Sequence, residues 1–94
     1  MTGADPSGWS WSATSTAQKE LRKLGGQDQT RVLDELDRLA AHDSGLNVKK
    51  LSGKFDGYVC WRLRVGTLRV VYTKDSPNRC FVVLRVDDRK NVYR

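Results

Sequence analysis

The chain has 94 residues, of which 38% are hydrophobic and 30% are charged, and its net charge is +6. This length supports one modest core and excludes two independent domains, while three Trp, three Tyr and two Phe exclude wholesale disorder. The two cysteines lack metal-ligand spacing, and no run reaches the roughly 20 apolar residues of a membrane span. We therefore expect no metal site, no membrane association and, without a signal peptide, a cytoplasmic location.

The positive charge is concentrated in the C-terminal half of the chain. Five Lys or Arg and seven Asp or Glu precede Lys49, whereas twelve and four occur from Lys49 onward. A basic half on a small domain attracts polyanions, because phosphate neutralisation releases counterions. Nucleic acid, an acidic protein, or both are the expected partners. The simpler alternative is a charge that only keeps the protein in solution.

The first residues predict a leader and a short strand. Residues 1–8 contain Gly, Asp, Pro and Ser, which is typical of a flexible leader, and residues 9–94 are expected to form a single domain. Residues 9–11 alternate Trp with Ser, a pattern that favours the start of a strand.

Two amphipathic helices are predicted next. Ser12 or Thr14 can cap the first helix, which ends at two glycines and carries the apolar stripe Ala17, Leu21 and Leu24. Asp28 can cap the second helix, whose apolar face consists of Val32, Leu33, Leu36, Leu39 and Ala40. The lone histidine, His42, follows this helix and is a poor candidate for a general base, since no orienting partner is near it in sequence.

The C-terminal half predicts a basic loop and a sheet. Residues 43–56 read as the loop, and strand-like runs follow over residues 58–65, 68–74 and 79–86. The short turns between these runs favour an antiparallel meander. The expected fold is therefore α+β, with two N-terminal helices packed on a twisted antiparallel sheet of about four strands.

A two-residue turn at Gly66 and Thr67 would fix the register of the first hairpin. Val65 would then lie opposite Leu68. One face would carry an apolar set that can receive the helices: Trp61, Leu63, Val65, Leu68, Val70 and Tyr72. The other face would carry Arg62, Arg64 and Arg69. If alternation continues in the last strand, one of its faces has Val82, Leu84 and Val86 and the other has Phe81, Val83 and Arg85.

The three arginines of the hairpin, Arg62, Arg64 and Arg69, indicate that this face binds an anion from outside the chain. Like charges opposite one another cost about 0.2–1 kcal/mol per pair in sheets, and no acidic residue occurs between Asp56 and Asp75. Arginine suits bidentate phosphate contact and stacking on bases, which favours RNA or DNA. The alternative is an exposed face whose arginines are balanced by acidic residues elsewhere.

Several motifs in this order resemble the RelE/ParE toxin superfamily, most closely its RelE branch. After the two helices come Lys50-Leu51-x-Gly53, Tyr58, Arg62-Leu63-Arg64-Val65-Gly66-x-x-Arg69-Val70-Val71-Tyr72, and Val86-x-x-Arg89-x-x-Val92-Tyr93-Arg94. The resemblance implies a type II toxin: a ribosome-dependent endoribonuclease that needs no metal or cofactor, uses ribose 2′-hydroxyl attack and arrests translation. It also implies a cognate antitoxin, mRNA and the ribosome as partners, with operator DNA bound only by the toxin–antitoxin complex.

The resemblance assigns roles to four candidate catalytic residues. Arg69 would hold the scissile phosphate, Arg89 would stabilise charge or assist the leaving group, and Tyr93 would stack on the substrate or help to deprotonate it. Arg62 would serve as an electrostatic or proton-transfer group. The surrounding cations are expected to contact RNA: Lys49, Lys50, Lys54, Arg64, Arg85, Lys90 and Arg94.

Two departures from the superfamily leave other functions open. Asp87 and Asp88 replace the Gly-His or Gly-Lys of many relatives, and Cys60 stands where a lysine is often found. One alternative is a ParE-like inhibitor of DNA gyrase. The other is a non-catalytic RNA-binding or antitoxin-docking module.

Overall fold

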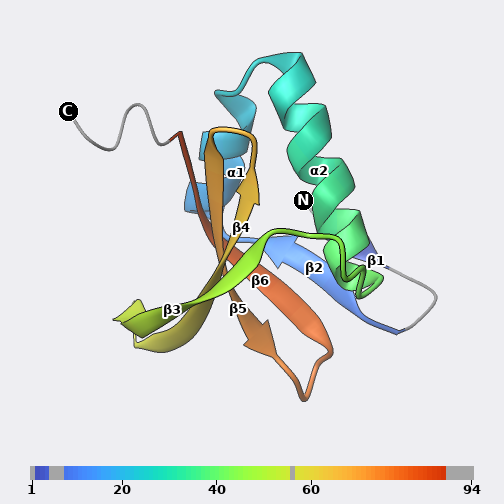
Figure 1. Cartoon of the computed structure of the whole chain (residues 1–94), viewed down its shortest axis with the longest axis vertical. Coiled ribbons are helices and arrows are strands. Elements are labelled where there is room, and N and C mark those ends of the chain that lie inside the picture. The colour runs from blue at the N-terminus through green and yellow to red at the C-terminus, as the bar shows by residue number, and fades with distance from the viewer. Residues whose placement is uncertain (1, 5–7, 56, 89–94) are drawn as a thin grey trace.

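A six-stranded sheet with two helices over one face forms the structure, a computed structural model that describes residues 2–4, 8–55 and 57–88 (Figure 1). The elements are β1 Thr2–Ala4, β2 Ser10–Ala13, α1 Ser15–Arg22, α2 Gly26–Ala40, β3 Val48–Phe55, β4 Tyr58–Val65, β5 Leu68–Asp75 and β6 Cys80–Asp88. The strand order is β1-β2-β6-β5-β4-β3, and the β2–β6 pair is parallel while the others are antiparallel. The predicted α+β fold is confirmed, although the sheet is mixed and has more than four strands.

Two segments that were expected to be irregular form the edge strands. Residues Thr2–Ala4 of the predicted flexible leader pair with β2, and Val48–Phe55 of the predicted basic loop pair with β4. An edge strand needs no buried face, and lysines on an edge discourage pairing with other chains. The polar composition of these segments therefore suggested loops, although backbone pairing makes them strands.

The N-cap of each helix is a residue type that favours a helix start, Thr14 for α1 and Gly25 for α2. The Thr14 hydroxyl accepts a hydrogen bond from the Ala17 amide at 3.2 Å and caps α1, as predicted. The second helix begins at Gly26 with Gly25 as its N-cap, so the predicted cap at Asp28 is wrong. Asp28 instead lies in the first turn, where its carboxylate faces the positive end of the helix dipole.

The core lies between the helices and the sheet. The predicted hairpin register is confirmed, with Val65 opposite Leu68 and Arg62 opposite Val71. The helix-facing side of this hairpin is buried as expected except for Trp61, which is partly buried, and it meets Leu21 of α1 and Leu36 of α2. Trp11 is also buried, and its indole N–H donates to Asp37 of α2 at 2.9 Å.

A β-bulge in β6 overturns the predicted faces of that strand. Val71 pairs with Arg85 but the next residue, Tyr72, pairs with Val83, so Leu84 is the extra residue. The bulge reverses the alternation after Val83, since one unpaired residue shifts every later side chain to the other face. The buried residues of β6 are consequently Phe81, Val83 and Val86. Arg85 turns away from them.

Because Tyr72 is buried, the protein should lose stability at alkaline pH. Its side chain is fully buried, and this desolvation raises the pKa of the phenol to about 12. The phenol therefore stabilises the fold fully below its unfolded pKa near 10, and this contribution is lost as the pH rises through 12. We expect the unfolding free energy of the wild type, relative to Tyr72→Phe, to fall between pH 10 and 12. Urea titrations of both proteins check this, and parallel pH profiles would contradict it.

Candidate functional site

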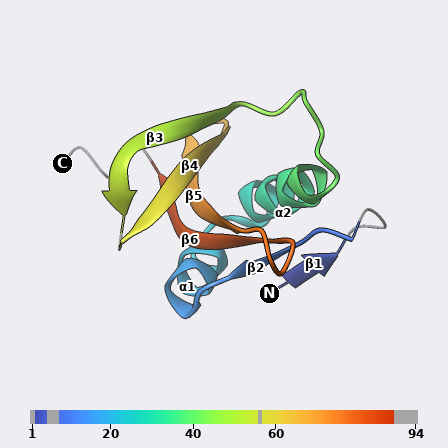
Figure 2. The ribbon, with the colours of Figure 1, turned by 90° about the horizontal axis from the view of Figure 1, so that it is seen from below.

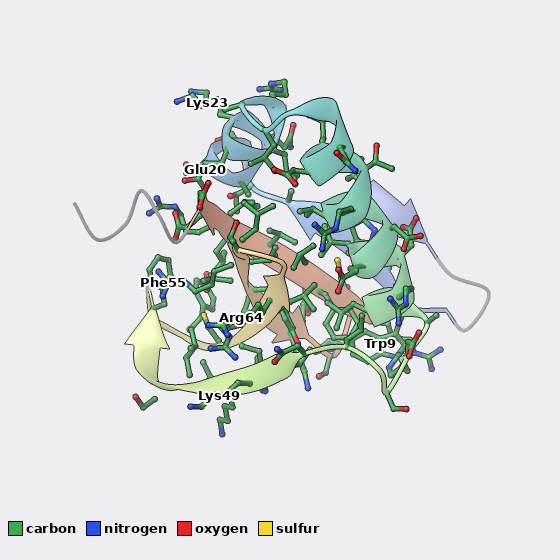
Figure 3. All side chains as sticks on the ribbon, turned by 45° about the horizontal axis from the view of Figure 1, so that its top comes forward. Trp9, Glu20, Lys23, Lys49, Phe55 and Arg64 are labelled. Carbon is green, nitrogen blue, oxygen red and sulfur yellow. The ribbon has the colours of Figure 1, made fainter. Side chains whose placement is uncertain are left out.

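Five cationic side chains share the sheet face opposite the helices. Backbone pairing puts Lys49, Arg62, Val71 and Arg85 in one row across β3, β4, β5 and β6, and puts Arg64, Arg69 and Asp87 in the next. Paired residues project to the same side of a sheet, so these cations are neighbours. We call this set the arginine face: Lys49, Arg62, Arg64, Arg69 and Arg85. Figure 3 labels Lys49 and Arg64 on the adjacent strands β3 and β4.

The other predicted site residues divide into two groups. Lys50 pairs with Trp61 and Lys54 pairs with Val59, so both project from the opposite face of the β3–β4 ribbon. That ribbon curves strongly away from the helices (Figure 2). The remaining predicted residues lie outside the described part of the chain: Arg89, Lys90, Tyr93 and Arg94.

Two carboxylates bind part of the arginine face. Glu20 of α1 accepts from Arg85 Nη2 at 2.9 Å and Nε at 3.1 Å, and also from the backbone amide of Val86 at 2.8 Å. Asp87 accepts from Arg85 Nη2 at 3.2 Å and forms an ion pair with Arg69 Nη2 at 3.6 Å. Arg85 is therefore held by two carboxylates although its side chain is 40% exposed, and Arg69 is held more loosely.

The guanidinium groups of Arg62 and Arg69 retain donors without partners. The Nε atom of each is buried, and neither makes a hydrogen bond within the described residues. A buried unpaired donor costs about 1–3 kcal/mol, more when it is charged. Both side chains are nevertheless partly exposed on adjacent strands of one face, so their terminal guanidinium N–H groups are suited to bind an external anion.

Neither a histidine nor a metal cluster accompanies these arginines in the described structure. His42 contacts Trp9, with ring centroids 5.2 Å apart, and Phe81, which belongs to the core on the helix side. Among the described residues, no group of three or more His, Cys, Asp or Glu could hold a metal ion. Neither Cys60 nor Cys80 forms a disulfide in the described part of the chain. None of the described helices has the length and apolar character needed to cross a bilayer.

Comparison with known families decides the classification. A family model described as the ParE toxin of the type II toxin–antitoxin system parDE matches residues 12–93, nearly the whole chain. The chain belongs to this toxin family. It is thus a type II toxin of the RelE/ParE superfamily, and the resemblance inferred from its motifs is confirmed. A comparison with curated proteins found no match.

Solved structures with the same fold are RelE toxins. The toxin is 26% identical to a chain of the RelBE2 complex of Mycobacterium tuberculosis, with a TM-score of 0.69 over 84% of this chain and 88% of that one. The isolated E. coli RelE toxin is 22% identical, with a TM-score of 0.66 over 83% and 81%. A chain of the RelB–RelE complex of Methanococcus jannaschii is 23% identical, with a TM-score of 0.66 over 86% and 93%. These neighbours agree with the RelE branch.

The arginines could be predicted from the sequence, but the carboxylate that binds Arg85 could not. Glu20 lies on the first helix, 65 residues before Arg85, so no local pattern connects the two. Asp87 was recognisable as an acidic residue in a basic strand. Its position directly opposite Arg69 depends on the bulge at Leu84, which alternation alone could not reveal.

Proposed function

We propose that this toxin is an endoribonuclease that cuts mRNA on the ribosome and arrests translation in the cytoplasm. The observation that carries the proposal is the clustering of Arg62, Arg64 and Arg69, all partly exposed, on one sheet face. The RelE names of its structural neighbours support the same reading. RNA phosphate is the polyanion that such a row of guanidinium groups suits best.

The proposed reaction is a transphosphorylation within the RNA chain. The ribose 2′-oxygen attacks the adjacent phosphorus as its proton leaves, the bond from phosphorus to the 5′-oxygen breaks, and that oxygen takes a proton. The products are a 2′,3′-cyclic phosphate and a free 5′-hydroxyl. Arg69 and Arg62 would stabilise the charge that develops on the phosphorane oxygens.

The proton carriers are assigned by resemblance alone. Tyr93 would stack on the substrate or help to deprotonate it, and Arg89 would stabilise charge or assist the leaving 5′-oxygen. Arginine is a poor base because of its very high pKa, so we do not assign the general base to Arg62. Lys49 and Arg64 would bind the neighbouring phosphates.

The same basic surface would bind a cognate antitoxin. Structural neighbours of the toxin were solved in RelB–RelE complexes. A basic face favours a segment rich in Asp and Glu, which would compete with RNA for Arg62 and Arg69. Operator DNA would be bound only by the toxin–antitoxin complex.

Inhibition of DNA gyrase is the second candidate, because the matching family model is described as a ParE toxin. One set of reactions tests both functions: purified toxin is added to programmed ribosomes, to naked RNA and to a gyrase supercoiling assay, and cuts are mapped by primer extension. We expect cuts in ribosome-bound mRNA and normal supercoiling. Intact RNA together with blocked supercoiling would overturn the proposal in favour of gyrase. Intact RNA with normal supercoiling would favour a non-catalytic docking module.

Asp87 should weaken RNA binding. Its carboxylate lies 3.6 Å from Arg69 and also contacts Arg85, so it competes with phosphate for both groups. Asp87→Asn should tighten binding of a short single-stranded RNA by roughly two- to fivefold at low salt, an effect that added salt reduces. Fluorescence anisotropy measures this. Asp34→Asn, which makes the same charge change on the exposed side of α2, is the control, and an equal gain in both variants would show a net-charge effect only.

A further inference from the structure

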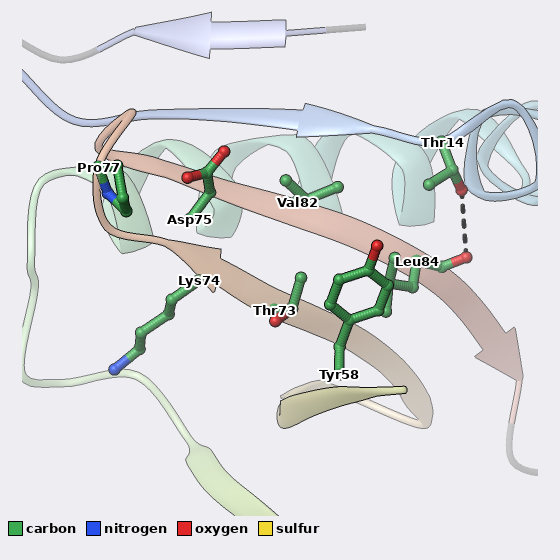
Figure 4. Close-up of a pocket in the computed structure, with 8 residues that line it drawn as sticks. All are labelled: Thr14, Tyr58, Thr73, Lys74, Asp75, Pro77, Val82 and Leu84. Atoms are coloured by element: carbon green, nitrogen blue, oxygen red, sulfur yellow. Dashed lines mark hydrogen bonds between the residues drawn. The ribbon is translucent and has the colours of Figure 1, made fainter. Parts of the chain in front are cut away.

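A second feature of the arginine-bearing face is a hollow of about 470 Å³ at the far end of β4 (Figure 4). Its lining is mostly apolar and includes Tyr58, Thr73, Pro77, Val82 and Leu84. Pockets that hold small ligands measure roughly 300–1,000 Å³ and combine apolar walls with a few polar groups. The hollow therefore has the volume and character of a binding site for one flat, uncharged group.

The hollow continues the arginine face along the strands. Tyr58 is four residues before Arg62 on β4, so alternation puts both side chains on the same side of the sheet. Between them, Cys60 pairs with Thr73, and Thr73 pairs with Val82. Four residues of strand span about 13 Å, so an extended chain bound at Arg62 can reach Tyr58.

The ring of Tyr58 is available for stacking. Tyr58 is 56% exposed, the highest value among the exposed large hydrophobic residues of the described chain. In Figure 4 its ring extends from β4 toward Leu84 on β6. An exposed aromatic ring beside a basic groove is the usual platform for an unpaired base, because every base has a stacking face.

The polar groups of the hollow favour a base over a phosphate. The hydroxyl of Thr73 donates to the Val59 carbonyl at 2.8 Å, and that of Thr14 donates to the Leu84 carbonyl at 3.3 Å. Lys74 and Asp75 also line the hollow. The ammonium of Lys74 lies over the Trp61 ring, 4.3 Å from its centroid. The carboxylate of Asp75 accepts from the Asn78 side chain at 2.8 Å and repels anions, including the acidic side chains of a peptide. It can still accept a hydrogen bond from the amino group of a base.

We propose that this hollow is a nucleobase subsite, in which Tyr58 stacks on an unpaired base of the RNA whose phosphate is bound at Arg62 and Arg69. The proposal rests on the proposed RNA-directed function and adds a second contact point to it. The two points fix the path of the strand across β4 and β5. Phosphate binding would supply affinity, and the subsite would set which nucleotide lies at the scissile position.

The test compares stacking variants on a fluorescein-labelled single-stranded RNA of mixed sequence. Tyr58→Ala should weaken binding roughly 5- to 100-fold, the range that alanine substitution gives for base–aromatic stacking, whereas Tyr58→Phe should stay within about twofold of the wild type. An RNA that lacks the base at one position should bind the wild type and Tyr58→Ala equally. Because Tyr58 is largely exposed, circular dichroism should report an unchanged fold in both variants.

Photocrosslinking provides a readout that needs no substitution. An RNA that carries 5-iodouridine at the stacked position should crosslink the wild type at Tyr58, as mapped by mass spectrometry, both free and on programmed ribosomes. Unchanged binding by Tyr58→Ala, or crosslinks that avoid Tyr58, would overturn the subsite. If Arg62→Ala loses binding in the same series, the RNA-directed function would survive that result.

Loss of antitoxin binding by Tyr58→Ala without loss of RNA binding would also overturn the subsite, and would make the hollow a protein-docking site. Absence of RNA binding and cleavage by the wild type would overturn the proposed function itself, together with the subsite.

Discussion

Replacing Arg69 with alanine is expected to reduce RNA cleavage by roughly 100- to 1,000-fold, because the loss of one donor that stabilises a transition-state oxyanion costs about 3–4 kcal/mol. Arg69 is the arginine on β5 whose Nε is buried and unpartnered in the described structure, and it lies opposite Arg64. Its ion pair with Asp87 at 3.6 Å is too long for a strong hydrogen bond, so a phosphate can displace that carboxylate.

The conservative variant separates charge from geometry. Arg69→Lys keeps the charge but loses the planar fork of donors, so its activity should lie between those of the wild type and Arg69→Ala. Cleavage is measured as single-turnover rates on programmed ribosomes by primer extension. Arg22→Ala, which removes the same charge from an exposed position on α1, is the control and should cleave normally. Equal rates for Arg69→Ala and Arg22→Ala would remove Arg69 from the reaction.

The centre of the sheet could be predicted because its signals are local. The turn at Gly66 and Thr67 fixes the register of β4 and β5, and apolar alternation then assigns their faces. The positions of Arg62, Arg64 and Arg69 followed directly. Three of the five cations of the arginine face therefore lie in this one hairpin and could be predicted from it.

The edges of the sheet and its last strand could not be predicted in the same way. β3 is exposed over most of its length and carries lysine, serine and glycine, so it has no apolar period to detect. In β6, every residue from Phe81 to the extra residue Leu84 is apolar, and a continuous apolar run hides a shift of alternation. Only the backbone pairing with β5 shows that Arg85 and Asp87 join the arginine face.

The side of the sheet on which Tyr58 lies could also be predicted from this hairpin. It shares its parity with Arg62 and Arg64 on β4, so the hairpin register already put an aromatic ring on the basic side of the sheet. The hollow beside it also requires Val82 and Leu84 from β6, and their orientation depends on the bulge. The ring could have been predicted from the sequence, and the cavity could not.

Glu20 is expected to contribute about 2–3 kcal/mol to stability, although it is a charged residue on a surface helix. β6 extends past the last residue of β2, where Ala13 pairs with Val83, so the Val86 amide lies beyond that strand. Glu20 accepts from this amide at 2.8 Å and from Arg85 at 2.9 Å. Val86 is 4% exposed, so without Glu20 its N–H would be left unsatisfied at a cost of about 1–3 kcal/mol.

The ion pair between Glu20 and Arg85 should contribute only a small part of the stability that Glu20 provides. The side chains of Arg85 and Glu20 are 40% and 21% exposed, and solvent reduces such pairs to about 1 kcal/mol or less. Glu20→Gln keeps an oxygen for the Val86 amide, so it should lose less stability than Glu20→Ala in urea denaturation. Glu35→Ala on α2 is the matched control and should change stability by less than about 0.5 kcal/mol. If Glu20→Gln were as destabilised as Glu20→Ala, the charge on Glu20 rather than the bond to Val86 would hold α1 against β6, and the arginine face would depend on that charge.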